Sequence, residues 1–323
     1  MAELSNKPTG VLVITGPTAS GKSAVAVKVA KRLNGEIISA DSVQIYKCLN
    51  VGSAKPTREE MEGIPHHLID SIEPTERFSV ADFRRQAEKC IVEIMSRARL
   101  PIVCGGTMLY IRSLMDGYAF PEGGYDPALR QELYRKYAEL GLAKLREDLQ
   151  SIDPVAARKI HPNDVRRAIR ALEVYFITGH PISDTWQEAK GLPYPLLTVA
   201  LDIERHELYS RIEQRVDKML QAGLAEEVLS LLSQGYSMRL QCFNSVGYAE
   251  VIRYLKGECT LEEARRLIIR NTRRLAKRQL TWLRNDDRIV WVYAGKHSQL
   301  EEVAERICTI YKNWRAGHEQ GSD

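Results

Sequence analysis

The chain of 323 residues is 44% hydrophobic and 27% charged, which is enough to bury the core of one or two domains. No stretch approaches the roughly 18 consecutive apolar residues of a membrane-spanning helix. The first ten residues also lack an apolar run, so we expect a cytoplasmic protein that is neither secreted nor inserted into a membrane. Six scattered cysteines without a CxxC pair argue against a zinc site or a disulfide framework. The net charge of +4 is too small to indicate a nucleic-acid partner by itself.

Alternating strands and helices are expected in the first third of the chain. In chain order they are a strand at 11–15 (VLVIT), a helix at 22–33, a strand at 36–41 (EIISAD), a helix that begins at a capping box of Ser79 and Asp82, and a strand at 101–106 (PIVCGG). Nearly continuous apolar runs are typical of strands buried on both faces of a parallel sheet. This alternation indicates the α/β class.

From about residue 119 the pattern changes to helices alone. The expected segments are 127–140, 142–149, 154–160 and 165–177. The last segment repeats apolar residues at helical spacing, at Val165, Ile169, Leu172 and Phe176. This repeat predicts its buried face and leaves Arg166 on another side.

A strand at 196–202 (LLTVALD) is expected to return the chain to the sheet, and helices dominate the remainder. The predicted organisation is an α/β core with C-terminal helices, made of 1–118 and 196–323, with an all-helical insertion at 119–195.

The segment GPTASGKS, residues 16–23, matches the pattern G-x-x-x-x-G-K-[ST] of a phosphate-binding loop, and it lies between an expected strand and an expected helix. Glycines allow backbone amides to surround phosphate oxygens, the helix N-terminus adds positive potential, Lys22 supplies a cation, and the Ser23 hydroxyl can bind Mg²⁺. A chance match at a strand-to-helix turn is the alternative. The residues expected to bind phosphate are Gly16, Thr18, Ala19, Ser20, Gly21, Lys22 and Ser23.

Nucleotide hydrolysis would also require an acid at the end of a second strand to hold the Mg²⁺ shell. The strand PIVCGG provides none. Asp202 is a possible substitute, but we favour a role for it as the cap of the following helix. The loop can therefore bind phosphates in a protein that does not hydrolyse ATP.

Asp41 and Thr107 follow two further strands. We expect the strand of Asp41 to lie beside the phosphate-loop strand, where the carboxyl ends of parallel strands gather ligands. Its carboxylate could hold a water molecule on Mg²⁺ or accept a proton from a nucleophile. Alternatively, it caps a helix that begins near Ser42. Thr107 either directs a hydroxyl into the same crevice or caps a turn.

Basic residues are concentrated near the C-terminus. Between 265 and 288 they are Arg265, Arg266, Arg270, Arg273, Arg274, Lys277, Arg278, Arg284 and Arg288, opposed by Asp286 and Asp287. Spacings of three and four place several of them on one stripe of a helix. A solvated surface is one interpretation; contact with nucleic-acid phosphates is the one we favour.

Seven stretches, in order along nearly the whole chain, resemble the tRNA dimethylallyltransferase family, also called tRNA isopentenyltransferase. They are GPTASGKS, ADSVQIY (40–46), GGTMLY (105–110), the run from His161 to Val174, RIEQRVDKML (211–220), VGYAE (246–250) and KRQLTWLRND (277–286). The resemblance implies a P-loop kinase-like fold with a helical insertion. It also implies transfer of a dimethylallyl group from dimethylallyl diphosphate to the exocyclic N6 amine of the adenosine 3′-adjacent to the anticodon, with release of pyrophosphate.

The resemblance also implies roles for residues. Asp41 would be the catalytic base, Thr107 would orient the substrate, and Arg215 would approach a diphosphate held by the loop, with Mg²⁺ on Ser23. The residues of this chain that would bind tRNA are Asp41, Ser42, Val43, Gln44, Thr107, Arg130, Arg166, Arg167 and Arg278. The implied partners are the tRNA anticodon stem-loop and dimethylallyl diphosphate, and no obligate protein partner is evident.

Two other classes share parts of this pattern. A P-loop small-molecule or nucleotide kinase would have the same loop and the helix of Arg215, with Asp41 as its catalytic base. An ATP-dependent RNA-binding protein would share the loop and the basic stripe.

Overall fold

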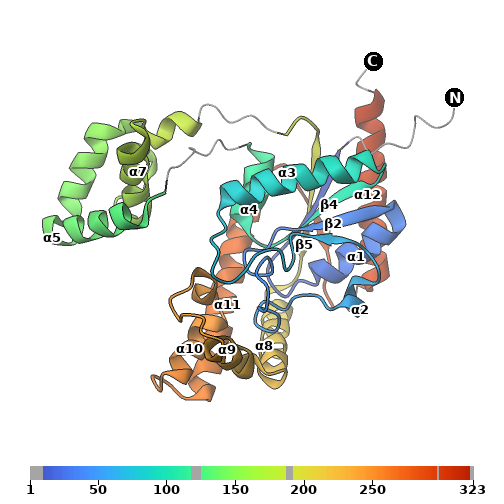
Figure 1. Ribbon diagram of the computed structural model, residues 1–323. Helices are drawn as coiled ribbons and strands as arrows, with labels where there is room; N and C mark the ends of the chain where they lie inside the picture. Colours follow the sequence, from blue (N-terminus) through green and yellow to red (C-terminus); the bar gives the residue numbers. More distant parts are fainter. Residues whose placement is uncertain (1–9, 118–124, 187–191, 297, 321–323) are drawn as a thin grey trace. The chain divides into compact units, whose positions relative to one another are not determined.

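The computed structural model describes residues 10–117, 125–186, 192–296 and 298–320 (Figure 1). The chain divides into two compact units: one comprises Met1–Ile111 with Pro193–Asp323, and the other comprises Arg112–Leu192. The expected boundary at residue 119 lies outside the described residues, and the expected boundary at 195 lies close to the observed division. No helix in the described ranges is long and apolar enough to cross a membrane.

The larger unit contains a six-stranded parallel sheet in the order β3-β2-β4-β1-β5-β6. Its strands are β1 (Val11–Thr15), β2 (Gly35–Ser39), β3 (His66–His67), β4 (Leu100–Gly105), β5 (Leu196–Asp202) and β6 (Ile289–Tyr293). Every residue of β1, β2 and β4 is buried, as their apolar sequences predict. The α/β class is therefore confirmed.

The helices of this unit are α1 (Lys22–Leu33), α2 (Arg58–Met61), α3 (Val80–Ser96), α8 (Arg205–Gln221), α9 (Leu224–Ser233), α10 (Tyr248–Leu255), α11 (Leu261–Arg284) and α12 (Leu300–Gln320). A short 3-10 helix, η3, occupies Gln241–Asn244. Helix α4 (Met108–Met115) begins in this unit. Helices α1 and α12 pack against each other beside the sheet (Figure 1). The capping box of Ser79 and Asp82 at the start of α3 is confirmed.

The position of β2 differs from the prediction. We expected the strand of Asp41 beside the phosphate-loop strand β1, but β4 lies between them and pairs with both. The connection from β1 through α1 skips one position in the sheet, and β4 fills it later. Strand β2 also ends at Ser39, so Asp41 lies in the loop beyond it.

Two further expectations near the end of β5 need correction. Helix α8 has Glu204 as its N-cap residue, so Asp202 does not cap it. Asp202 is instead the last residue of β5, and its backbone carbonyl accepts a hydrogen bond from Ala294 N at 2.8 Å. Strand β6 was not expected either, although the run IVWVY is rich in the β-branched and aromatic residues that favour strands.

The regular elements of the smaller unit are all helices within its described residues. Its elements are α5 (Pro127–Ile152), α6 (Pro154–Lys159), α7 (Val165–Thr178) and the 3-10 helix η2 (Ile182–Trp186). Gly141 interrupts α5 with a φ of 83°, at the break that the sequence predicts. On α7 the prediction of the buried face is half right: Ile169 and Leu172 are buried, whereas Val165 and Phe176 are 37% and 49% exposed.

A buried carboxylate organises this helical core. Glu173 of α7 is fully buried, and its Oε2 lies 2.8 Å from Arg170 Nη1 and also binds the guanidinium of Arg130. Its other oxygen accepts a hydrogen bond from Asp126 N at 3.2 Å. Helix α7 is therefore tied to the beginning of α5 by a satisfied ionic cluster.

We predict that Glu173→Ala lowers the free energy of unfolding of the helical unit by about 3 kcal/mol, because two guanidinium groups lose their shared counterion. Denaturant titration monitored by circular dichroism measures this change. The matched control is Glu147→Ala, which removes an exposed glutamate of α5. Equal unfolding midpoints for the two variants would contradict the prediction.

Candidate active site

The loop with the phosphate-binding sequence pattern, residues 16–23, connects β1 to α1, where the sequence places it. Gly16 has a φ of 149°, and a Cβ atom there would lie 3.0 Å from Ser20 Oγ and 3.3 Å from Leu201 N. Gly21 is the N-cap residue of α1, with a φ of 83° and no side-chain cap. The first amides of α1 are therefore free of a side-chain cap and suited to an anionic ligand.

A second observation also points to a ligand here. The hydroxyl of Ser20 is buried and has no hydrogen-bond partner within the described ranges. Buried polar atoms are nearly always satisfied, so the Ser20 hydroxyl fits a polar ligand atom such as a phosphate oxygen at this loop.

The loop borders a pocket of about 330 Å³, lined also by Ala54, Pro56 and Arg215. Lys22 and Arg215 bring two cations to it from α1 and α8. Burial lowers the pKa of both groups, and the carboxylate of Asp41 acts on both in the opposite direction. An anion bound between the two cations would favour their charged forms.

Asp41 lies in a turn after β2. Its Oδ1 accepts hydrogen bonds from Val43 N at 2.9 Å and Gln44 N at 3.3 Å. The capping alternative is thus partly right, although residues 42–45 form turns and not a helix. Asp41 Oδ2 has no hydrogen-bond partner within the described ranges. One oxygen fixes the orientation of the carboxylate, and the other remains able to accept a proton.

Thr107 joins the loop after β4 to the turn of Asp41. Its hydroxyl oxygen accepts a hydrogen bond from Ser42 N at 3.0 Å and lies 3.3 Å from Ser42 Oγ. Its backbone amide donates to Ala40 O at 3.1 Å. The structure therefore brings Asp41, Ser42 and Thr107 together, even though β2 and β1 are not neighbours.

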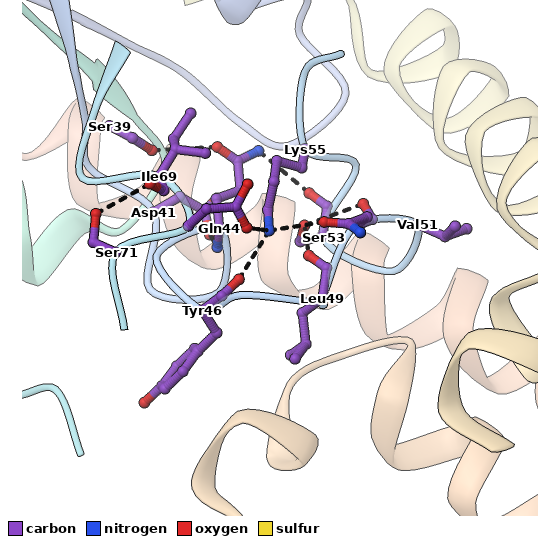
Figure 2. Close-up of polar contacts among 12 residues, drawn as sticks. Ser39, Asp41, Gln44, Tyr46, Leu49, Val51, Ser53, Lys55, Ile69 and Ser71 are labelled. Atoms are coloured by element: carbon purple, nitrogen blue, oxygen red, sulfur yellow. Dashed lines mark hydrogen bonds and ion pairs between the residues drawn. The ribbon is translucent and has the colours of Figure 1, made fainter. Parts of the chain in front are cut away.

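Gln44 is bonded within its own loop (Figure 2). Its Oε1 accepts from Ser39 Oγ at 3.2 Å, and its Nε2 donates to the backbone carbonyls of Ser53 at 3.3 Å and Ala54 at 3.2 Å. Ser53 O also accepts a hydrogen bond from Arg215 at 3.4 Å. The carboxamide that the resemblance assigns to tRNA binding is thus occupied by protein partners in this structure.

Lys55, which sequence reasoning did not identify, anchors the same loop (Figure 2). Only 5% of its side chain is exposed. Its ammonium group donates to Tyr46 O at 2.8 Å and Asn50 Oδ1 at 2.9 Å, and it forms an ion pair with Asp70. The loop that carries the turn of Asp41 is therefore held by a buried cation.

Glu227 of α9 provides a second anchor that was not predicted. Its Oε2 accepts hydrogen bonds from Asn50 N and Val51 N, each at 2.8 Å. Its Oε1 accepts a hydrogen bond from the hydroxyl of buried Tyr248 at 2.7 Å. Tyr248 belongs to the VGYAE stretch, which was the available sequence signal for this contact.

The predicted tRNA-binding arginines have different environments. Arg166 and Arg167 are exposed on α7, and Arg167 lies 3.4 Å from Asp164. Arg130 is engaged with buried Glu173 and stacks 4.5 Å over the ring of Tyr125. In the larger unit, Arg278 is exposed on α11.

A basic cavity of about 490 Å³ lies between α8 and α11. Its cationic lining residues are Arg265, Arg266, Arg270, Arg273, Arg274 and Lys277. Arg273 stacks 4.7 Å over the ring of Tyr209 and pairs with Glu213. The stripe expected from the sequence is thus one wall of a hollow, and Arg270, Arg274 and Lys277 form no ion pair within the described ranges.

We predict that Lys55→Met lowers the free energy of unfolding by about 2 kcal/mol, because Tyr46 O, Asn50 and Asp70 lose the charged donor that they share. The loop at 44–55 should also become more sensitive to limited proteolysis. The control is Lys47→Met, which removes an exposed lysine of the same loop that pairs with Glu73. The role of Lys55 as an anchor is refuted if both variants resist denaturant and protease equally.

Comparison with known proteins gives consistent results. Residues 44–286 match the IPP transferase family. The chain is 51% identical over 301 residues to the tRNA dimethylallyltransferase of Carboxydothermus hydrogenoformans, which covers 93% of this chain and 96% of the relative. It resembles the full-length tRNA isopentenylpyrophosphate transferase of Bacillus halodurans, with a TM-score of 0.72, 41% identity and coverage of 97% and 100% of the two chains. It also resembles a eukaryotic dimethylallyltransferase acting on tRNA, with a TM-score of 0.83, 28% identity and coverage of 96% and 80%.

Proposed function

The chain belongs to the IPP transferase family, and on this premise we propose that it is a tRNA dimethylallyltransferase. It transfers a dimethylallyl group from dimethylallyl diphosphate to the exocyclic N6 amine of the adenosine 3′-adjacent to the anticodon, and it releases pyrophosphate. The observation that carries this proposal is the electrostatic effect of the Asp41 carboxylate on Lys22 and Arg215, the two cations at the loop. Only Oδ1 of this carboxylate is hydrogen-bonded within the described ranges. Because the proposed substrate is tRNA, we also propose a cytoplasmic location.

The donor side stabilises the leaving group. As the allylic C–O bond breaks, negative charge accumulates on the diphosphate. The uncapped amides at the start of α1 and the side chains of Lys22 and Arg215 are placed to receive this charge. Partial burial strengthens each of these interactions relative to water.

The acceptor side supplies the base. An exocyclic amine of adenine is a weak nucleophile because its lone pair is delocalised into the ring. We infer that Asp41 Oδ2 accepts a proton from this amine as the new C–N bond forms, while Oδ1 stays bonded to the turn. The Thr107 hydroxyl holds Ser42 and keeps that turn in place.

Mg²⁺ fits this site as a partner of the diphosphate. Ser23 is exposed at the start of α1 and lines the pocket, so its hydroxyl can reach a metal ion. The described residues contain no group of three or more His, Cys, Asp or Glu side chains that could hold a metal. Mg²⁺ usually keeps several waters and shares substrate phosphates, so the hydroxyl and the diphosphate suffice. The ion would neutralise part of the charge on the leaving group.

The RNA must present an unstacked base, because an adenine inside the anticodon loop cannot reach the donor otherwise. We propose that exposed Arg166 and Arg167 of the helical unit and Arg278 of α11 bind RNA phosphates. In the larger unit, Arg270, Arg274 and Lys277 of the basic cavity are further candidates for contacts with RNA phosphates. Arg130 would support tRNA binding indirectly, by stabilising the packing of α5 against α7, because its guanidinium group is bound to Glu173.

The first test is product formation. We expect labelled dimethylallyl diphosphate to label unmodified tRNA in the absence of ATP, with release of pyrophosphate. Transfer of label from the γ-phosphate of ATP would instead identify a kinase, and RNA-stimulated ATP hydrolysis would identify a motor. Either of these results without prenyl transfer would refute the proposed function.

The second test separates the base from the diphosphate site. Asp41→Ala should lower kcat by at least about 100-fold, because the amine loses its proton acceptor. The affinity for pyrophosphate, measured by calorimetry, should stay within about threefold. The comparison variant is Lys22→Ala, which should weaken pyrophosphate binding strongly. A loss of pyrophosphate affinity in Asp41→Ala with residual catalysis would reverse the assignment.

The third test concerns the helical unit. Arg166→Ala should weaken tRNA binding several-fold and reduce the salt dependence of the association constant by about one counterion, because a phosphate contact is lost. Filter binding at several salt concentrations measures both quantities. The matched control is Arg135→Ala, an exposed arginine of α5. Identical tRNA affinities for the two variants would remove Arg166 from the RNA-binding surface.

A further inference from the structure

We propose that Gln279 is a positioning residue that fixes the diphosphate loop relative to the acceptor loop. This inference rests on the proposed function, but one of its tests does not require activity. Gln279 lies on α11, far along the chain from both loops, and its side chain is 6% exposed. Its side chain is uncharged, so it adds no charge to the site of the diphosphate or to that of the amine. Its role follows from the two hydrogen bonds of its carboxamide.

The carboxamide bridges two segments that hold opposite partners of the reaction. Its Oε1 accepts a hydrogen bond from the backbone amide of Thr18 at 2.8 Å, and its Nε2 donates to the carbonyl of Gly106 at 2.8 Å. Thr18 belongs to the phosphate-binding loop, and Gly106 precedes Thr107, which holds Ser42 next to Asp41. Gln279 therefore links the donor side to the acceptor side.

The contact with Gly106 is tight. A Cβ atom on Gly106 would lie 2.7 Å from Gln279 Nε2 and 3.4 Å from Lys22 Nζ. The end of β4, the bridging amide and the loop cation thus occupy one small volume. Glycine at this position leaves the room that the bridge requires.

Glutamine is suited to this position because one planar group supplies a donor and an acceptor. An ionised carboxylate of the same length could accept from Thr18 N but would repel the carbonyl oxygen of Gly106. A methionine would fill the space and supply neither hydrogen bond. Substitutions at this position can therefore separate hydrogen bonding from packing.

The expected consequence is kinetic. The bridge sets the separation between the carbon that loses diphosphate and the amine that attacks it, and small misplacements of reacting groups lower rates strongly. Since Gln279 holds loops and not ligands, its loss should reduce kcat more than the affinity for either substrate. A residue with a purely structural role would change stability without this selective effect.

The experiment compares Gln279→Met and Gln279→Glu with Thr281→Val. The control lies two positions away on the exposed side of α11, and its hydroxyl donates to Lys277 O at 2.9 Å within the same helix. We expect Gln279→Met to lower kcat by about 10- to 100-fold. The pyrophosphate dissociation constant and the tRNA dissociation constant should stay within about threefold of wild type. Melting temperatures establish that each variant is folded at the assay temperature.

The pH profile of Gln279→Glu is the sharper readout. When the new carboxyl group is protonated, it can donate to Gly106 O and accept from Thr18 N, as glutamine does. Its kcat relative to wild type should therefore rise as the pH falls, whereas the ratio for Gln279→Met should stay flat. Flat ratios for both variants, or a loss that resides wholly in KM, would overturn the proposal.

A measurement that does not depend on activity tests the Gln279 bridge separately from the proposed transferase function. Amide hydrogen exchange in segments 16–23 and 105–110 should be faster in Gln279→Met than in Thr281→Val. Unchanged exchange in both segments refutes the bridge even if wild type is active. Faster exchange supports the bridge even if wild type forms no prenylated tRNA, a result that would count against the proposed function alone.

Discussion

The uncapped start of α1 is the constraint on which the rest of the larger unit depends. Gly21 provides no side-chain cap for the first amides of the helix, and the buried Ser20 hydroxyl has no hydrogen-bond partner among the residues that the structure describes. A fold can keep such unsatisfied groups only if the surrounding structure holds the loop in place. Here buried contacts from distant elements do so, namely the carboxamide of Gln279 and the packing of β1 between β4 and β5. These contacts hold the loop through protein groups alone.

Much of the larger unit could be predicted because its signals are local. The apolar run at 11–15, the phosphate-loop pattern and the capping box of Ser79 each specify structure from a few neighbouring residues. The order of the strands could not be predicted in the same way, since the position of β4 between β1 and β2 depends on a crossover that no short segment encodes. Strand β6 carried a local signal that sequence reasoning overlooked.

The site shows the same division between local and distant signals. Asp41 and Thr107 were found because they follow strands whose carboxyl ends meet at one edge of the sheet. Lys55 and Glu227 were missed because their partners, both backbone groups and side chains, are brought close only by folding. The exposure of Phe176 has a related cause: an apolar residue at helical spacing marks a face, but only tertiary contacts decide how wide the buried part of that face is.

The hydrogen bonds of the Gln44 carboxamide have a consequence for selectivity. A nucleobase that accepts from its Nε2 must displace one of the two loop carbonyls, because both N–H groups are used, whereas Oε1 keeps one lone pair beside its bond from Ser39. Such an exchange of equivalent hydrogen bonds yields little net binding free energy. A base whose edge offers an acceptor to Nε2 restores the lost hydrogen bond, whereas a mismatched base leaves a part-buried N–H group or carbonyl unpaired. At a nucleobase contact, such an arrangement would discriminate against wrong bases without strengthening the binding of the right one, which suits an enzyme that must release each product.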